Sequence, residues 1–118
     1  MLTVISGTDS LLLSKKTKEC LESQNIVSDS VSYVDDPSID ILRESVAAQD
    51  LFGNMLTFVF RKLNDEVYDF LFSNIESFSQ SRNNFVAQVQ KVLKKQKDIC
   101  ESVEVKIIEV KAIKEREM

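Results

Sequence analysis

Hydrophobic and polar residues along the chain follow two periods, one typical of strands and one typical of helices. Four apolar runs are short and bounded by turn residues, which predicts strands over 2–6, 30–34, 55–60 and 104–110. The run from 55 to 60 is apolar on both alternating faces, as expected of a strand that is covered on both sides. It is the most hydrophobic strand candidate in the sequence.

Between these strands, apolar residues recur at helical spacing. A first helix is predicted over 11–23, with Asp9 or Ser10 as its N-cap, and a later helix begins after Asn64 or Asp65. The apolar faces of these two helices carry Leu13, Cys20 and Leu21 in the first, and Val67, Leu71, Ile75 and Phe78 in the second.

A helix between these two has a start signal and a stop signal. Asp36 followed by Pro37 predicts its start, because a capping side chain precedes a residue that favours the first turn. Ile39, Leu42 and Val46 then recur at helical spacing. Gly53 is predicted to end the helix, since glycine supplies the backbone freedom that a helix terminus needs.

The sequence after the Asn64 helix admits two interpretations. Residues 77–84 are polar and serine-rich, which predicts a loop. Beyond it, alternation predicts a short strand over 85–90 followed by a helix from about Leu93. Helical spacing also fits one continuous helix over 84–102. We favour the strand and helix, by a small margin.

Strands that alternate with helices form βαβ units. We therefore predict an α/β fold, a three-layer sandwich with a mainly parallel five-stranded sheet. No internal repeat, linker or low-complexity segment interrupts the chain, so residues 1–118 are expected to form a single domain. Residues 111–118 are charged and are predicted to be a frayed tail.

Composition narrows the classes of function. The 118 residues are 43% hydrophobic and 29% charged, which is typical of a globular domain with its own core. A net charge of -4 argues against nucleic acid as the dominant partner. No apolar run approaches the roughly 20 residues of a membrane span. The first residues show neither a charged leader nor a cleavage site, so we expect a cytoplasmic protein without a membrane partner.

The chain has no histidine and only two cysteines, Cys20 and Cys100, which are far apart in the sequence. The usual Cys/His metal sites are therefore excluded, and both cysteines are expected to be reduced packing residues. A Ser/His/Asp triad needs a histidine, and Cys100 has no candidate base beside it. We expect no catalysis and no cofactor.

The first strand and helix are joined where nucleotide-binding α/β folds hold phosphate. A P-loop needs Gly-x-x-x-x-Gly-Lys-Ser/Thr, but the segment after Gly7 lacks a second glycine and places leucines at 11–13. Asp9 would repel a phosphate at this turn. Gly-x-Gly-x-x-Gly is absent as well. We therefore do not expect nucleotide binding.

Two charged clusters have an ordinary explanation beside a functional one. Asp35 and Asp36 could form an acidic metal or phospho-acceptor pair, but helix capping by Asp36 is the favoured interpretation. Lys91, Lys94 and Lys95, followed by Lys97, could make a weak DNA contact. A solvated helix face is the favoured interpretation of the lysines, because the chain as a whole is acidic.

Leu51 and Phe52 are two large apolar residues immediately before Gly53. Large apolar residues are usually buried, so a contact that tucks both under the helix end is the more common arrangement. Neighbours on a helix diverge by about 100°, however, so both cannot easily face one core. An exposed aromatic side chain at this position would mark a partner site.

The order and spacing of these motifs resemble the N-terminal domain of the delta subunit of the bacterial DNA polymerase III clamp loader. Residues 4–9, Val-Ile-Ser-Gly-Thr-Asp, are similar to that family's opening strand and Gly-x-Asp turn. Residues 42–60 look like its helix, leucine-phenylalanine pair, turn and apolar third strand. Residues 85–110 resemble its fourth strand, basic Lys-x-x-Lys segment (here Lys91 and Lys94), helix and final strand. The resemblance covers almost the whole chain.

This resemblance implies an AAA+-type domain with P-loop-NTPase-like topology but without a functional P-loop. It implies that the domain binds and helps to open the sliding clamp, the beta subunit, with Leu51 and Phe52 as an apolar plug and Gly53 as the supporting turn. In a longer chain, other clamp-loader subunits would be partners, and DNA would be contacted only indirectly. The family's protein also has a helical middle domain and an oligomerising collar, to which nothing in this sequence corresponds.

Two other functions remain open on the sequence. The chain could be a small phosphate-binding enzyme that uses the turn at residues 7–10. It could also be an interaction domain of a different complex, with Leu51 and Phe52 buried.

Overall fold

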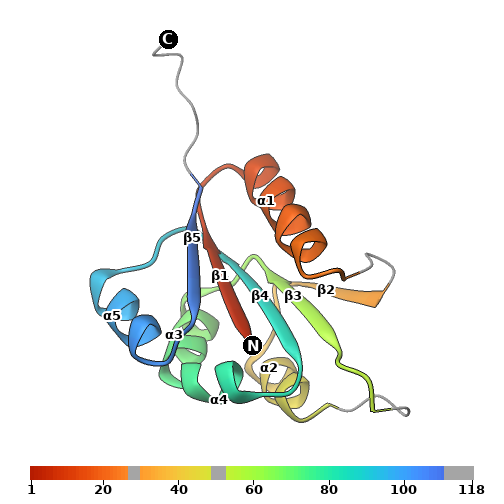
Figure 1. The fold of residues 1–118 in the computed structure, drawn as a ribbon. Helices are drawn as coiled ribbons and strands as arrows, with labels where there is room; N and C mark the ends of the chain where they lie inside the picture. The colour runs from red at the N-terminus through yellow and green to blue at the C-terminus, as the bar shows by residue number, and fades with distance from the viewer. Residues whose placement is uncertain (27–29, 49–52, 111–118) are drawn as a thin grey trace.

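The structure, a computed structural model, describes residues 1–26, 30–48 and 53–110. These residues form an α/β fold with a five-stranded sheet in which every pairing is parallel (Figure 1). In chain order the elements are β1 (Leu2–Ser6), α1 (Ser10–Ser23), β2 (Val31–Asp35), α2 (Ile39–Ala47), β3 (Thr57–Arg61), α3 (Asp65–Ser73), α4 (Ile75–Gln80), β4 (Asn84–Val89), α5 (Lys94–Ser102) and β5 (Lys106–Glu109). The predicted fold class is confirmed at this level.

The strands lie in the order β2-β3-β4-β1-β5, so the opening strand is inside the sheet and β2 and β5 are its edges. β1 pairs with β4, with Val4 opposite Ala87, and with β5, with Val4 opposite Ile107. All five residues of β1 and all six of β4 are buried. Because all strands are parallel, their carboxyl ends meet at one edge of the sheet.

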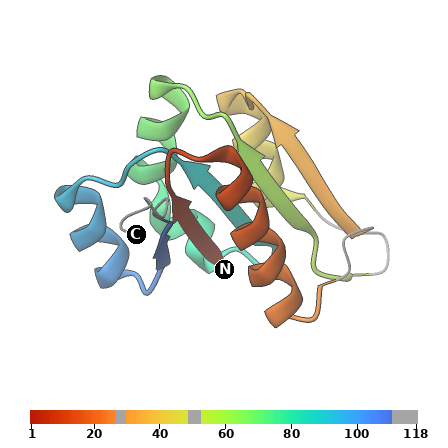
Figure 2. The ribbon, with the colours of Figure 1, turned by 90° about the horizontal axis from the view of Figure 1, so that it is seen from above.

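The two faces of the sheet are covered unequally (Figure 2). Helices α2, α3, α4 and α5 cover one face, where the larger apolar cluster includes Phe60, Phe78 and Phe85. In the described part of the chain, α1 is the one helix on the other face, where it contributes Leu13, Cys20 and Leu21. Adjacent strand residues such as Phe85 and Val86 belong to different clusters, since side chains alternate across a sheet. The predicted three-layer arrangement follows from this alternation.

Local signals located most elements correctly. Asp9 is the N-cap of α1, where its Oδ1 accepts hydrogen bonds from the amides of Leu11 (2.9 Å) and Leu12 (3.3 Å). Asn64 is the N-cap of α3, where its Oδ1 accepts from the amide of Val67 at 2.8 Å. The two interpretations of residues 84–102 are resolved in favour of a strand, β4, followed by a helix, α5.

The predicted start of α2 is wrong. Its N-cap is Ser38, whose Oγ accepts a hydrogen bond from the amide of Ile41 at 3.2 Å. Asp36 instead adopts a left-handed φ of 50°, and its amide donates to the carbonyl of Arg61 at 2.8 Å. An N-cap residue needs extended backbone, and the left-handed φ of Asp36 does not supply it, so Asp36 belongs to the turn between β2 and α2.

Two other predicted boundaries are wrong. Helix α2 ends at Ala47, and Ala48 follows in extended backbone, so Gly53 is not the residue that ends this helix. The segment 77–84 was predicted to be a loop, but its first residues belong to α4. Ile75 and Phe78, three residues apart on this short helix, are both buried, and that burial outweighs the polar composition around them.

Candidate functional site

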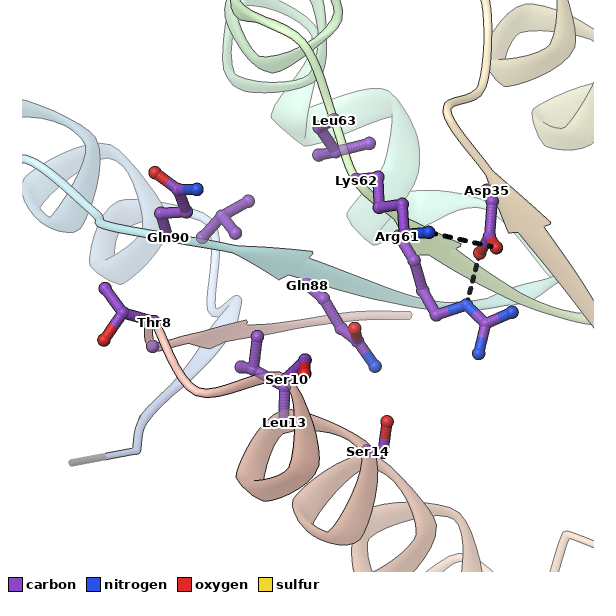
Figure 3. Close-up of a pocket in the computed structure, with 12 residues that line it drawn as sticks. Thr8, Ser10, Leu13, Ser14, Asp35, Arg61, Lys62, Leu63, Gln88 and Gln90 are labelled. Carbon is purple, nitrogen blue, oxygen red and sulfur yellow. Dashed lines mark hydrogen bonds and ion pairs between the residues drawn. The ribbon is translucent and has the colours of Figure 1, made fainter. Parts of the chain in front are cut away.

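A crevice opens at the carboxyl ends of the strands, where ligands of open parallel sheets usually bind (Figure 3). The turns after β1, β3 and β4 and the end of β2 meet around a cavity of about 330 Å³. Thr8 comes from the turn after β1, Ser10 from the start of α1, Arg61 from the end of β3, and Gln88 from β4. The position of the cavity makes it the first place to look for a small-molecule site.

The opening turn uses its own groups where a phosphate would bind. The carboxylate of Asp9 accepts hydrogen bonds from the amides of Leu11 and Leu12, two of the free donors at the start of α1. These amides and the helix dipole are what an anion would use, and a fixed carboxylate repels it.

Gly7 serves the packing of strands at this turn. A Cβ atom at Gly7 would lie 2.8 Å from the carbonyl oxygen of Val110. The amide of Gly7 donates to the carbonyl of Val89 at 2.9 Å. The amide of Val110 donates to the carbonyl of Ser6 at 2.7 Å. Glycine is therefore required here because β1 and the chain after β5 approach closely.

The cations of the crevice face a carboxylate. Arg61 Nε lies 2.5 Å from Asp35 Oδ1, and Lys62 Nζ lies 3.9 Å from Asp35 Oδ2 (Figure 3). The guanidinium of Arg61 also stacks 5.0 Å from the ring centre of Tyr33. In the described part of the chain, no three His, Cys, Asp or Glu side chains gather closely enough to hold a metal ion. Asp35 thus acts as an ion-pair partner on the sheet edge.

A buried polar chain, which the sequence did not reveal, runs below the crevice. Gln88 Nε2 donates to Thr17 Oγ1 at 2.8 Å, and Thr17 Oγ1 donates to the carbonyl of Leu13 at 2.7 Å. Gln88 is 9% exposed and Thr17 is 2% exposed, so these bonds satisfy polar groups that have left water. The available signal was a glutamine near the end of a strand that is mostly apolar. Its hydrogen bond to Thr17 fixes α1 against β4.

Leu51 and Phe52, the predicted partner-binding pair, lie outside the described residues. Gly53 is described, is exposed and has a φ of 76°. A Cβ atom there would meet nothing within 4 Å, so backbone conformation and not space favours glycine. The role of Gly53 as the turn that supports Leu51 and Phe52 stays a prediction, and α2 ends before Gly53.

Asn83, which the sequence analysis did not single out, connects the two described sides of that segment. Its Nδ2 donates to the carbonyls of Ser45 (3.0 Å) and Ala48 (2.8 Å), and its Oδ1 accepts from the amide of Leu56 at 3.2 Å. The residue is fully buried. Ser81 Oγ adds a hydrogen bond to the carbonyl of Val46 at 3.2 Å. These side chains satisfy carbonyls at the end of α2, which explains why the helix ends without a glycine.

The predicted lysine cluster lies at the connection between β4 and α5. Lys91, Lys94 and Lys95 are exposed, and none of them forms an ion pair with a described residue. Lys97, farther along α5, pairs with Glu109 at 2.6 Å. The sequence grouped these four residues, and the structure separates Lys97 from the other three.

Cys100 is fully buried on the inner side of α5. Burial raises the pKa of its thiol, because the thiolate loses its hydration. A raised pKa is the opposite of what a cysteine nucleophile needs. The expected packing role of this residue fits its position.

A scan against protein-family models finds no match for this chain, and a search of curated proteins finds none either. Within the residues described here, no helix has both the length and the apolar character needed to cross a membrane.

Proposed function

We propose that this chain is the N-terminal domain of a clamp-loader delta subunit, which binds the sliding clamp in the cytoplasm and helps to open it without catalysing a reaction. The observation that carries the proposal is the state of the opening turn. β1 lies inside a parallel sheet and leads into α1, as in P-loop folds. The Asp9 carboxylate nevertheless takes the amides that a nucleotide would use. An AAA+-like scaffold that has lost its nucleotide is what the resemblance implies.

The strand order also supports P-loop-NTPase-like topology. The sequence β2-β3-β4-β1-β5 places the opening strand between the fourth and the fifth, with its turn at the edge of the sheet where ligands bind.

In this proposal Leu51 and Phe52 enter an apolar pocket of the clamp. Burying a large apolar side chain contributes roughly 1.5–3 kcal/mol, so the pair would act as an interface hot spot. Ring opening follows if the domain binds the open clamp more tightly than the closed one, since a ligand shifts an equilibrium only by its difference in affinity.

The anchoring by Asn83 supports a binding role for this part of the chain. Ala48 before the segment and Leu56 after it are both hydrogen-bonded to the buried side-chain amide of Asn83. Fixing the flanks of a binding segment lowers the conformational entropy that is lost on association.

The test is the double variant Leu51→Ala, Phe52→Ala, titrated against the sliding clamp of the same organism. Loss of both side chains should weaken binding at least about a hundredfold. Leu11→Ala is the matched control, because Leu11 is a leucine of α1 that is 80% exposed. Unchanged clamp affinity in a double variant with a native circular dichroism spectrum would refute the proposal.

A second titration addresses the alternative of a phosphate-binding enzyme. ATP with Mg²⁺ should leave the melting temperature unchanged, because Asp9 occupies the start of α1 and Asp35 faces the nearby cations. A saturable rise in melting temperature would favour that alternative over the clamp-loader proposal.

A further inference from the structure

A second surface of the molecule combines partly exposed apolar groups with lysines that form no ion pair with a described residue. A groove of about 240 Å³ lies between α3 and the connection from β4 to α5. Leu63, Tyr68, Val89, Lys91 and Leu93 line it, together with Asp65. We call it the Leu93 groove. All of its residues are described.

The apolar wall of the Leu93 groove is preformed. Tyr68 is held by a hydrogen bond from its hydroxyl to the carbonyl of Lys91 at 2.9 Å, and its ring lies 4.7 Å from the ring of Phe72. Leu93 stands beside it with 48% of its surface exposed. An apolar side chain from a partner would therefore meet a rigid tyrosine and an uncovered leucine without a prior rearrangement.

The lysines beside the groove stand where helix stability disfavours them. Lys94 and Lys95 are the first two residues of α5, at the positive end of the helix dipole, and the first turn contains no acidic residue. The N-cap, Leu93, makes no side-chain capping bond. Helix α3 shows the stabilising alternative, with an Asn64 cap followed by Asp65 and Glu66. Folding alone thus does not account for the two lysines or the exposed leucine.

We propose that the Leu93 groove binds an acidic protein segment that carries one large apolar side chain. The apolar side chain would pack between Tyr68 and Leu93, and its flanking carboxylates would face Lys91, Lys94 and Lys95. Charge complementarity identifies the partner: Lys91 lines the groove, Lys94 and Lys95 directly follow Leu93, and none of the three pairs with a described residue, on a chain whose net charge is -4. DNA is the less suitable occupant, since a phosphate backbone has no use for the apolar wall of the groove.

The first experiment uses a random peptide library displayed on phage, selected against the full chain. Enriched peptides should combine Asp or Glu with a large apolar residue. One such peptide, labelled with fluorescein, is then titrated by anisotropy. Leu93→Ser should weaken its binding at least about tenfold, as should Lys94→Glu with Lys95→Glu. Lys15→Glu with Lys18→Glu, which makes the same charge change on exposed residues of α1, should leave binding unchanged.

A structural readout separates recognition from folding. Lys94→Glu with Lys95→Glu should raise the melting temperature while it abolishes peptide binding, because glutamates suit the start of α5. A fall in both the melting temperature and the peptide affinity would mean that the lysines stabilise the fold, and would overturn the proposal.

Three other results would also overturn it. They are the absence of an acidic and apolar consensus, peptide binding that survives Leu93→Ser, and lysine-dependent binding of a duplex oligonucleotide that Leu93→Ser leaves unchanged. The inference does not rest on the clamp proposal. The Leu51→Ala, Phe52→Ala variant should bind the peptide like the wild type, so the two can fail separately.

Discussion

Replacing Asn83 by alanine should destabilise this protein far more than replacing the neighbouring asparagine. Asn83 is fully buried, and its side chain makes three hydrogen bonds to the backbone at Ser45, Ala48 and Leu56. The substitution leaves two carbonyls and one amide without these partners. At about 1 kcal/mol of net stability for each neutral hydrogen bond, the expected loss is about 3 kcal/mol. That is a large part of the roughly 5–15 kcal/mol that stabilises an ordinary domain.

Asn84→Ala is the matched control because it removes the same atoms from an adjacent residue that is also buried. Its Nδ2 makes one hydrogen bond, to Gln24 Oε1 at 2.7 Å, and its Oδ1 has no partner. We expect this variant to lose only about 1 kcal/mol of hydrogen bonding. The cost of the cavity is similar in the two variants, so the difference between them reports the extra hydrogen bonds of Asn83.

The assay is equilibrium unfolding in urea, with the free energy extrapolated to water and the slope compared among variants. Asn83→Asp adds a second comparison. It keeps an acceptor for the amide of Leu56 but places oxygen where two carbonyls need a donor, so it should be at least as destabilising as alanine. Equal losses in Asn83→Ala and Asn84→Ala would refute the reasoning, because they would show that the three hydrogen bonds add nothing.

Two further outcomes follow from the N-cap of α1 and from the buried thiol. Asp9→Ala should lower the free energy of unfolding by about 1 kcal/mol in urea, through loss of the N-cap, whereas Ser14→Ala on the same helix should change it little. For Cys100, burial raises the pKa in the folded chain above its ordinary value of 9.0, so the folded state holds the proton more tightly than the unfolded state. Its contribution to stability is full below pH 9.0 and falls as the pH rises above it. Urea titrations on either side of that pH should show this decline, and Cys100→Ala should reduce it. An unchanged slope in the alanine variant would contradict the assignment to this thiol.

Those parts of the fold that depend on nearby residues could be predicted from the sequence. β1 extends over the predicted residues, because an apolar run followed by glycine is a local signal. Asp9 and Asn64 cap α1 and α3 through bonds to residues two or three positions ahead. The parallel sheet follows from the alternation of strands with helices.

The wrong boundaries depended on residues that are distant in the chain or on the shape of one turn. The end of α2 is satisfied by Asn83, which is 35 residues beyond Ala48, so no helix-stop signal nearby could reveal it. Asp36 has the chemistry of a cap, but its left-handed φ and the hydrogen bond from its amide to Arg61, 25 residues ahead, place it in the turn after β2. Gln88 and Thr17 were invisible as a pair, because α1 and β4 meet only in the folded chain.

The candidate sites also combine features that depend on neighbouring residues, which the sequence predicts, with features that depend on residues distant in the chain, which it does not. The failure of the phosphate-binding motif was readable from the sequence, since it depends on which residues follow Gly7. The Leu93 groove could not be predicted from the sequence, because Leu93 meets Leu63 and Tyr68, which are distant from it in the chain, only in the folded protein. The lysines were visible as a cluster, but coordinates were needed to show that Lys97 pairs with Glu109 whereas the other three pair with no described residue.

Because α1 alone covers one face of the sheet, local opening of the molecule should begin with that helix. Among the described residues, the cluster under α1 has six buried members, against fifteen in the cluster on the opposite face. Detachment of α1 would therefore cost less free energy than global unfolding, and its amides would exchange with solvent first. The same event would uncover apolar strand surface, which makes partial unfolding the route by which this protein would aggregate.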